Sequence, residues 1–252
     1  MAQNNYLLQR VRQEDCLLAL LPCSGGSVIN PLKSGSNMYP EFNKSDQHSW
    51  AERNGLITTN NIIIKDNVFT AADPTRLASI KTDLNMQNNN TSKTFIAQAV
   101  FHNINDGRIH ISPLFNQGVY VQDYPSYVFN LNFRQLSTTG YFNISFSRTN
   151  NTKVSVSHIV KDSFYDQLHT VAFVYDIIPD SVTVNIKLYI DTKLVANKAF
   201  EHIPWRIPNP PYDKNTLNIR EDVEEPYLSD NQLAWAVIFD SALSAEEIAL
   251  FK

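Results

Sequence analysis

Apolar and polar residues alternate along most of the chain from residue 94 onward, a pattern typical of β-strands with one buried face. The clearest case runs from Val182 to Ile190, where Val182, Val184, Ile186, Leu188 and Ile190 are expected to point inward and the other face to be solvated. The run from Val171 to Tyr175 is apolar on both faces and is therefore predicted to lie centrally in a sheet.

Runs of this kind predict about a dozen strands, separated by turn residues. They lie at residues 16–21, 56–64, 94–102, 108–112, 119–122, 127–134, 141–147, 153–160, 169–175, 182–190, 193–200, 216–220 and 233–239. Helical pattern is sparse, with single turns predicted at 74–80 and 162–167, and residues 22–55 and 82–93 are predicted to be loops. The pattern predicts an all-β, antiparallel two-sheet jelly-roll sandwich forming a single domain over residues 1–252, with residues 1–15 as an N-terminal extension.

The end of the chain predicts one strand and one short C-terminal helix. The strand places large residues on one face and small ones on the other: Leu233, Trp235, Val237 and Phe239 against Ala234 and Ala236. Ser244 and Glu247 then have the spacing of a capping box, and Leu243 and Ile248 that of a hydrophobic staple.

Four segments resemble the laminin-G-like, or concanavalin A-like, lectin and glucanase superfamily. They are FIAQAVF at 95–101, HTVAFVYD at 169–176, KLYIDTKLVA at 187–196 and the final strand with its helix. The resemblance implies a sandwich with the last helix packed beneath it, and a structural role for His169 at a strand entrance. The family's hairpin usually turns on Asp-Gly, whereas Asp191 is followed here by Thr192, so a different or wider turn is expected.

Composition narrows the classes of partner. Charged residues make up 18% of the chain and the net charge is −4, with Lys and Arg scattered, so nucleic-acid binding is not expected. The surface is instead rich in Asn, Ser, Thr and Gln, which suits uncharged polar partners. Cys16 and Cys23 are separated by roughly 23 Å if the chain between them is extended, so both are predicted to be free thiols.

The sequence gives no sign of export or of a membrane span. The apolar run after Glu14 and Asp15 is short and contains Pro22, so it matches neither a signal peptide nor a membrane span. The chain is therefore expected to be made in the cytoplasm. A lectin-like protein is expected to act outside the cell, and lysis of a phage-infected cell would release one that is made in the cytoplasm. One predicted setting is therefore a phage virion.

Catalysis is not predicted. Glucanases of this fold use carboxylates spaced Glu-x-Asp-x-x-Glu on one strand face, and the chain lacks that spacing. The nearest acidic cluster, residues 221–225, also reads as a solvated charge run. His158 is in phase with buried valines and is predicted to be a core histidine. The resemblance implies calcium at the sandwich rim, with Asp176, Asp191 and Asp230 as candidates, but no metal is assigned.

Two aromatic and polar groups are candidate ligand-binding residues, because sugars stack on aromatic rings while amides, acids or arginine fix their hydroxyls. The first is Trp205, Arg206, Asn209, Tyr212 and Asp213, on a proline-stiffened segment. The second is Tyr120, Asp123, Tyr124 and Tyr127. The alternative for the first group is that Trp205 closes the end of the sandwich and the prolines route a crossover.

The sequence therefore favours a non-catalytic recognition or adhesion module that binds a glycan or another surface ligand. One alternative is a structural virion assembly protein with protein partners, and a second is a glycoside hydrolase of the same fold. Homo-oligomerisation is left open.

Overall fold

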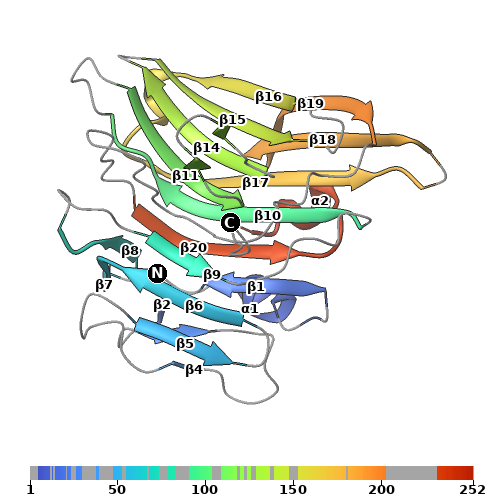
Figure 1. Ribbon diagram of the computed structural model, residues 1–252. Coiled ribbons are helices and arrows are strands. Elements are labelled where there is room, and N and C mark those ends of the chain that lie inside the picture. Colours follow the sequence, from blue (N-terminus) through green and yellow to red (C-terminus); the bar gives the residue numbers. More distant parts are fainter. Residues whose placement is uncertain are drawn as a thin grey trace.

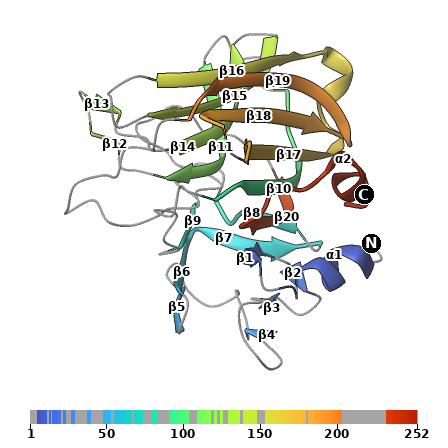
Figure 2. The same cartoon turned by 90° about the vertical axis from the view of Figure 1, so that its right-hand side faces the viewer.

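Two large antiparallel sheets pack face to face and confirm the all-β sandwich (Figures 1 and 2). The computed structural model describes residues 5–11, 13, 15–20, 22–23, 27–29, 38–39, 48–52, 55–66, 68–73, 79–82, 91–103, 109–117, 120–121, 124–125, 129–136, 139–147, 153–179, 181–202 and 232–251. Every strand pair in it is antiparallel, including pairs such as β10 with β20 that are far apart in the sequence.

The first sheet has eight strands and contains the central run predicted from the sequence. Its order is β19 (Lys193–Glu201), β18 (Thr183–Ile190), β17 (Leu168–Ile177), β10 (Lys93–Val100), β20 (Gln232–Phe239), β8 (Val68–Ala71) and β7 (Ile62–Lys65), with β1 (Cys16–Leu20) also paired to β20. Residues 171 to 175 of β17 are all buried, which confirms the predicted central position.

The second sheet has four strands, β11 (Ile109–Gln117), β14 (Phe129–Leu136), β15 (Thr139–Ser147) and β16 (Lys153–Val160), in that order. Its inner face meets the first sheet in one aromatic core. Phe101 lies 4.8 Å from Phe133 and 5.3 Å from Phe142, centroid to centroid, while Phe95 lies 5.4 Å from Phe115. Edge-on and tilted ring pairs of this kind add to the area burial that holds the two sheets together.

Smaller strands occupy part of the predicted loop 22–55, so that prediction was wrong in part. They are β2 (Pro22–Cys23), β3 (Ser27–Ile29), β4 (Met38–Tyr39) and β5 (His48–Glu52). Two further small strands follow: β6 (Gly55–Asn60), which overlaps the strand predicted at 56–64, and β9 (Ser79–Thr82). Several are only two or three residues long, too short for alternation to reveal them, and pairing with a neighbour defines them. Ile80 lies in β9 and not in the helical turn predicted at 74–80, while residues 74–78 and the predicted strand at 216–220 lie outside the described residues.

A β-bulge in β20 corrects the prediction that Leu233, Trp235, Val237 and Phe239 share one face. Gln98 of β10 pairs with Trp235, but the next residue, Ala99, pairs with Leu233, so Ala234 is an extra residue. One extra residue reverses the side to which later side chains point. Leu233 therefore packs between the sheets, whereas Val237 and Phe239 pack on the opposite face.

That opposite face is covered by two short helices, α1 (Asn5–Arg10) and α2 (Ala245–Ile248). A second apolar cluster forms between these helices and the sheet around Val237. It includes Leu7 of α1 with Val11 directly after it, and Ile248 of α2 with the nearby Phe251. The predicted capping box is confirmed, because Glu247 N donates to Ser244 Oγ at 3.1 Å and Ser244 N donates to Glu247 Oε2 at 2.8 Å. The turn predicted at 162–167 contains the short 3-10 helix η1 (Asp162–Phe164).

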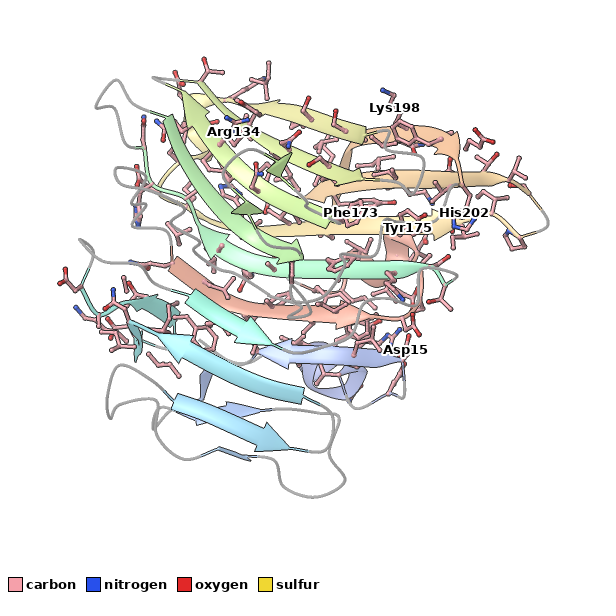
Figure 3. The ribbon with its side chains drawn as sticks, viewed as in Figure 1. Asp15, Arg134, Phe173, Tyr175, Lys198 and His202 are labelled. Atoms are coloured by element: carbon pink, nitrogen blue, oxygen red, sulfur yellow. The ribbon has the colours of Figure 1, made fainter. Side chains whose placement is uncertain are left out.

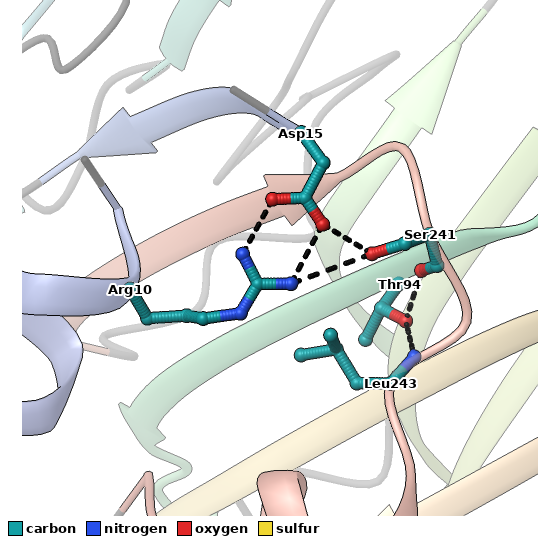
Figure 4. A network of polar contacts seen from close by, with 5 residues as sticks. All are labelled: Arg10, Asp15, Thr94, Ser241 and Leu243. Carbon is teal, nitrogen blue, oxygen red and sulfur yellow. Dashed lines mark hydrogen bonds and ion pairs between the residues drawn. The ribbon is translucent and has the colours of Figure 1, made fainter. Parts of the chain in front are cut away.

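Polar side chains join the two ends of the chain over this cluster (Figure 4). The buried guanidinium of Arg10 forms a two-pronged ion pair with Asp15, with 2.6 Å between Nη2 and Oδ2, and Ser241 Oγ donates to the same carboxylate. Thr94 Oγ1 donates to the carbonyl of Ser241 at 2.7 Å and accepts from Leu243 N at 2.9 Å. The first helix is thereby fixed to the segment that follows β20.

The hairpin between β18 and β19 corrects two expectations. Ile190 pairs with Lys193, so the turn has only two residues, and both have positive φ: 50° at Asp191 and 72° at Thr192. This is a tight primed turn made without glycine, and not the different or wider turn that the sequence led us to expect. Val182 is 73% exposed and precedes the strand, while Tyr189 is buried against the second cluster, so neither follows the predicted alternation.

Candidate functional site

The outer face of the four-stranded sheet carries a group of mostly neutral polar side chains, with one arginine and one isoleucine among them. Because Leu131, Phe133, Phe142, Ile144, Val154 and Val156 point into the core, the residues between them point away from it. Pairing across β14, β15 and β16 aligns these outer residues in rows. We call them the amide face: Asn132, Arg134, Tyr141, Asn143, Ser145, Ser155, Ser157 and Ile159.

Burial falls across the amide face from the middle strands to the edge strand. Asn132 is 4% exposed and Ser145 is 1% exposed, while Arg134, Tyr141 and Asn143 are half-buried. On β16 the outward residues are exposed, and Ile159 is 67% exposed. The members of this face that a ligand could contact directly are therefore the exposed residues of β16 and the half-buried residues beside them, while Asn132 and Ser145 are shielded.

Two buried polar atoms of this face have no hydrogen-bond partner: Asn132 Oδ1, an acceptor, and Arg134 Nε, a donor. They belong to residues two apart on one strand, which places their Cα atoms roughly 7 Å apart on the same side. A buried polar group without a partner costs about 1–3 kcal/mol, so such groups are uncommon in folded proteins. A polar ligand that reached this acceptor and this donor would satisfy both of them.

Tyr141 places the guanidinium of Arg134. The two residues are direct cross-strand partners, and the guanidinium carbon of Arg134 lies 5.8 Å from the centroid of the Tyr141 ring. The attraction of a cation for the ring face holds Arg134 over the sheet, as seen where it projects from β14 in Figure 3. Ile159 continues the same row on β16.

The short hairpin β12 (Tyr120–Val121) and β13 (Tyr124–Pro125) lies on the side of the four-stranded sheet that faces away from the eight-stranded sheet (Figure 2). The backbones of Tyr120 and Tyr124, two of the predicted ligand residues, therefore lie on the same side of the molecule as the amide face. Asp123 and Tyr127 lie outside the described residues. So does the whole first group, Trp205, Arg206, Asn209, Tyr212 and Asp213, which stays a prediction.

The histidine at the start of β17 has a structural role. His169 is 8% exposed, and its Nδ1 lies 2.6 Å from Asp191 Oδ2 while its Nε2 lies 2.7 Å from the carbonyl oxygen of Phe164. Its ring also stacks on that of Phe164, with centroids 4.0 Å apart. His169 thus links η1 to the β18–β19 turn, as the resemblance implied.

Two of the three calcium candidates are bound to other side chains. Asp176 pairs with Lys187 at 2.7 Å, and Asp191 binds His169 and also accepts from Thr170 N at 3.1 Å. Asp230 and the acidic cluster at 221–225 lie outside the described residues. In the part of the chain that is described, no group of three or more His, Cys, Asp or Glu side chains is placed to hold a metal ion.

Two other side chains discussed from the sequence have structural surroundings, His158 on the inner face of the four-stranded sheet and Cys16 in the second apolar cluster. His158 lies in phase with Val156 and Val160 and is half-buried, and burial lowers its pKa, so this histidine is neutral at pH 7. Cys16 is a buried free thiol, as predicted.

None of the described helices has the length and apolar character needed to cross a bilayer.

The amide face was not predicted from the sequence, although a signal for it is present there. In FNLNFRQL at 129–136 and YFNISFS at 141–147, the apolar positions predicted the core, and the residues alternating with them are mostly Asn, Ser, Arg and Tyr. That alternation indicates a polar outer face, but the alignment of the rows depends on strand order and register.

No protein-family model matches the sequence, and no curated protein matches it. Several solved structures resemble the fold. A structure described as a receptor binding domain matches with 13% identity and a TM-score of 0.60, over 98% of this chain and 52% of that one. The botulinum neurotoxin serotype D binding domain matches with 14% identity and a TM-score of 0.58, over 94% of this chain and 51% of that one.

Two further matches are complexes. The ligand binding domain of the same serotype D toxin, in complex with N-acetylneuraminic acid, matches with 14% identity and a TM-score of 0.51, over 94% of this chain and 50% of that one. A Trypanosoma rangeli sialidase with a bound difluoro-nononic acid matches with 11% identity and a TM-score of 0.53, over 92% of this chain and 31% of that one.

At these identities the likeness shows the fold alone. It supports the lectin-like β-sandwich that the sequence predicts, while the laminin-G-like family and a virion origin stay predictions. The chain spans about half the length of the binding-domain chains it matches, and less of the sialidase.

Proposed function

We propose that this protein is a non-catalytic glycan-binding module and that the amide face is its binding surface. The observation that carries the proposal is the unpartnered acceptor of Asn132 beside the unpartnered donor of Arg134. A sugar hydroxyl both donates and accepts, so one sugar can satisfy both atoms. Amide and hydroxyl side chains with a nearby aromatic ring are the groups that fix and stack sugars in binding sites.

The solved structures of similar fold support this class of function. They include toxin domains described as receptor-binding, one of them in complex with N-acetylneuraminic acid. A sialidase also shares the fold, so the glycosidase alternative stays open to test. The virion assembly alternative rests on the sequence alone.

A glycan array probed with the purified chain tests the proposal, with Asn132→Ala and Asn143→Ala as site variants. Asn185→Ala is a matched control, because Asn185 is also a half-buried asparagine within a strand but lies in β18 of the other sheet. We expect each site variant to weaken binding of the best glycan roughly threefold to tenfold, the effect of losing one hydrogen bond, and the control to leave binding unchanged. Circular dichroism and the urea midpoint verify that each variant is folded.

Each contrary result excludes a stated part of the proposal. Absence of any glycan signal from the folded wild type would exclude glycan binding, and co-purification with assembled particles would then favour the assembly alternative. Binding lost on Trp205→Ala but kept in both site variants would move the site to the proline-rich segment. Cleavage of the bound glycan by the wild type would show an enzyme.

A further inference from the structure

We infer that the glycan bound at the amide face carries a carboxylate, and that Arg134 is the residue that recognises it; this inference rests on the proposed function. The first reason is that Arg134 differs from the other shielded cations. Arg10, Lys93 and Lys187 have side chains that are 6%, 2% and 26% exposed, and each is paired with an aspartate. Arg134 is half-buried as well, yet no described carboxylate pairs with it.

Leaving a guanidinium partly out of water without an anion is unfavourable, because the lost hydration is not replaced. The Tyr141 ring offsets only part of that cost, and it contacts the face of the guanidinium and not its N–H groups. Those N–H groups lie in the plane of the guanidinium and match the two oxygens of a carboxylate. The described residues give Arg134 no such partner, and a carboxylate from a ligand would supply one.

The charge on the amide face favours the same partner. Arg134 is the only charged residue among its eight members, and no acid lies among them to repel an anion. Asn132 lies two residues before Arg134 on the same strand, and its unpartnered Oδ1 can accept a hydrogen bond from a hydroxyl or N–H of the same sugar. Ile159, at the exposed end of the row, offers apolar contact to the sugar's C–H groups.

Carboxylated sugars come from two sources, sialic acids and uronic acids, and both present the same group to an arginine. The test measures the affinity of the full chain for sialyllactose and for a hyaluronan tetrasaccharide, each compared with its carboxyl-reduced, neutral form. We expect one acidic probe to bind roughly tenfold to a hundredfold more tightly than its neutral form, since hydrogen bonds between charged groups are the stronger kind. The preferred probe identifies the source.

Three variants assign the effect to Arg134. In Arg134→Gln the acidic probe should bind only as well as the neutral form, whose own affinity should fall by no more than the roughly threefold to tenfold expected for the single hydrogen bond from Arg134 Nε. Arg134→Lys keeps the charge but not the two-pronged geometry and should lose most of the preference. Lys198→Gln is the matched control, because Lys198 also lies over an aromatic ring, 5.0 Å from the centroid of Phe200, on the edge strand of the other sheet (Figure 3). It should leave both affinities unchanged.

Equal binding of the acidic and neutral forms by wild type would overturn the inference while leaving the proposed function intact, provided that Asn143→Ala still weakens binding. An equal loss of both forms in Arg134→Gln would show that Arg134 supports the sheet and does not read a carboxylate. If Arg134→Gln fails to fold, the comparison of acidic and reduced probes on wild type decides alone. Absence of all glycan binding would overturn the proposed function and the inference together.

Discussion

The hydroxyl of Tyr165 lies directly against the Cα of Gly140, in the space that a Cβ would fill. Gly140 is in β15, and the same space is bounded by the ring of Phe133 and by Val160. The hydroxyl therefore ends in apolar surroundings, is buried and has no hydrogen-bond partner. Burial, with the nearby charge of Asp162 as a smaller cause, raises the pKa of Tyr165.

Tyr165→Phe should stabilise the protein by about 1 kcal/mol, because it removes a buried polar group that has no partner and keeps the ring. Urea unfolding followed by fluorescence measures the change as a higher midpoint with an unchanged slope. Tyr141→Phe is the control, since the Tyr141 side chain is half-exposed, and its midpoint should move little. A lower midpoint for Tyr165→Phe would mean that the hydroxyl has a partner in solution.

Gly140→Ala should destabilise the protein by about 1–3 kcal/mol, the cost of adding a methyl group to a filled core. The new Cβ would lie 2.7 Å from the ring of Phe133 and closer still to the Tyr165 hydroxyl. In the double variant with Tyr165→Phe the loss should be smaller, because the group nearest to the new Cβ is gone. Strictly additive losses in a double-mutant cycle would contradict this contact.

Most strands were predictable from the sequence because their alternation depends on local residues alone. Phe95, Ala97, Ala99 and Phe101 do share the core, as their spacing indicates. The capping box at Ser244 and Glu247 is equally local and was also predicted. Such features depend on residues a few positions apart and so can be read without knowing the fold.

The features that were missed depend on a partner strand. The bulge at Ala234 exists because of how β20 pairs with β10, and nothing in β20 alone marks it. Among the described side chains of helix α1, Leu7 and Arg10 are buried, and Val11 directly after the helix is buried as well, too few apolar positions to give a helical period. The amide face required the order β14, β15, β16 before Arg134 could be placed beside Tyr141.

Thr192→Gly should stabilise the protein by about 0.5–1 kcal/mol. Thr192 has a φ of 72°, which a β-branched residue adopts at a cost of about 1–2 kcal/mol. Glycine removes this strain, but it loses more backbone entropy on folding than threonine does, so the net stabilisation is smaller than the strain. The variant also creates the Asp-Gly pair that primed turns favour. The urea midpoint measures it, with Thr183→Gly in extended strand β18 as a control that should be destabilised. A destabilised Thr192→Gly would mean that the Thr192 side chain makes contacts worth more than the strain.

Asp15→Asn should make the free energy of unfolding depend less on pH in acid. The hydrogen bond from Arg10 is the main cause that holds the pKa of Asp15 below its usual value, with Ser241 as a smaller contributor, although burial opposes both. A carboxylate with a lowered folded-state pKa contributes stability above its unfolded value of about 3.9 and loses it as pH falls through the folded value. Wild type should therefore lose more unfolding free energy than Asp15→Asn between about pH 5 and pH 2.

At pH 7 the same variant should already be less stable by about 2 kcal/mol, because the neutral amide binds the buried Arg10 guanidinium more weakly than the carboxylate does. Ser241→Ala should show a slope between those of wild type and Asp15→Asn, since it removes only one hydrogen bond to the carboxylate. Urea unfolding at several pH values gives all three curves. Parallel curves for wild type and Asp15→Asn below pH 4 would show that the contact between Arg10 and Asp15 does not persist in solution, and that α1 is held by its apolar residues alone.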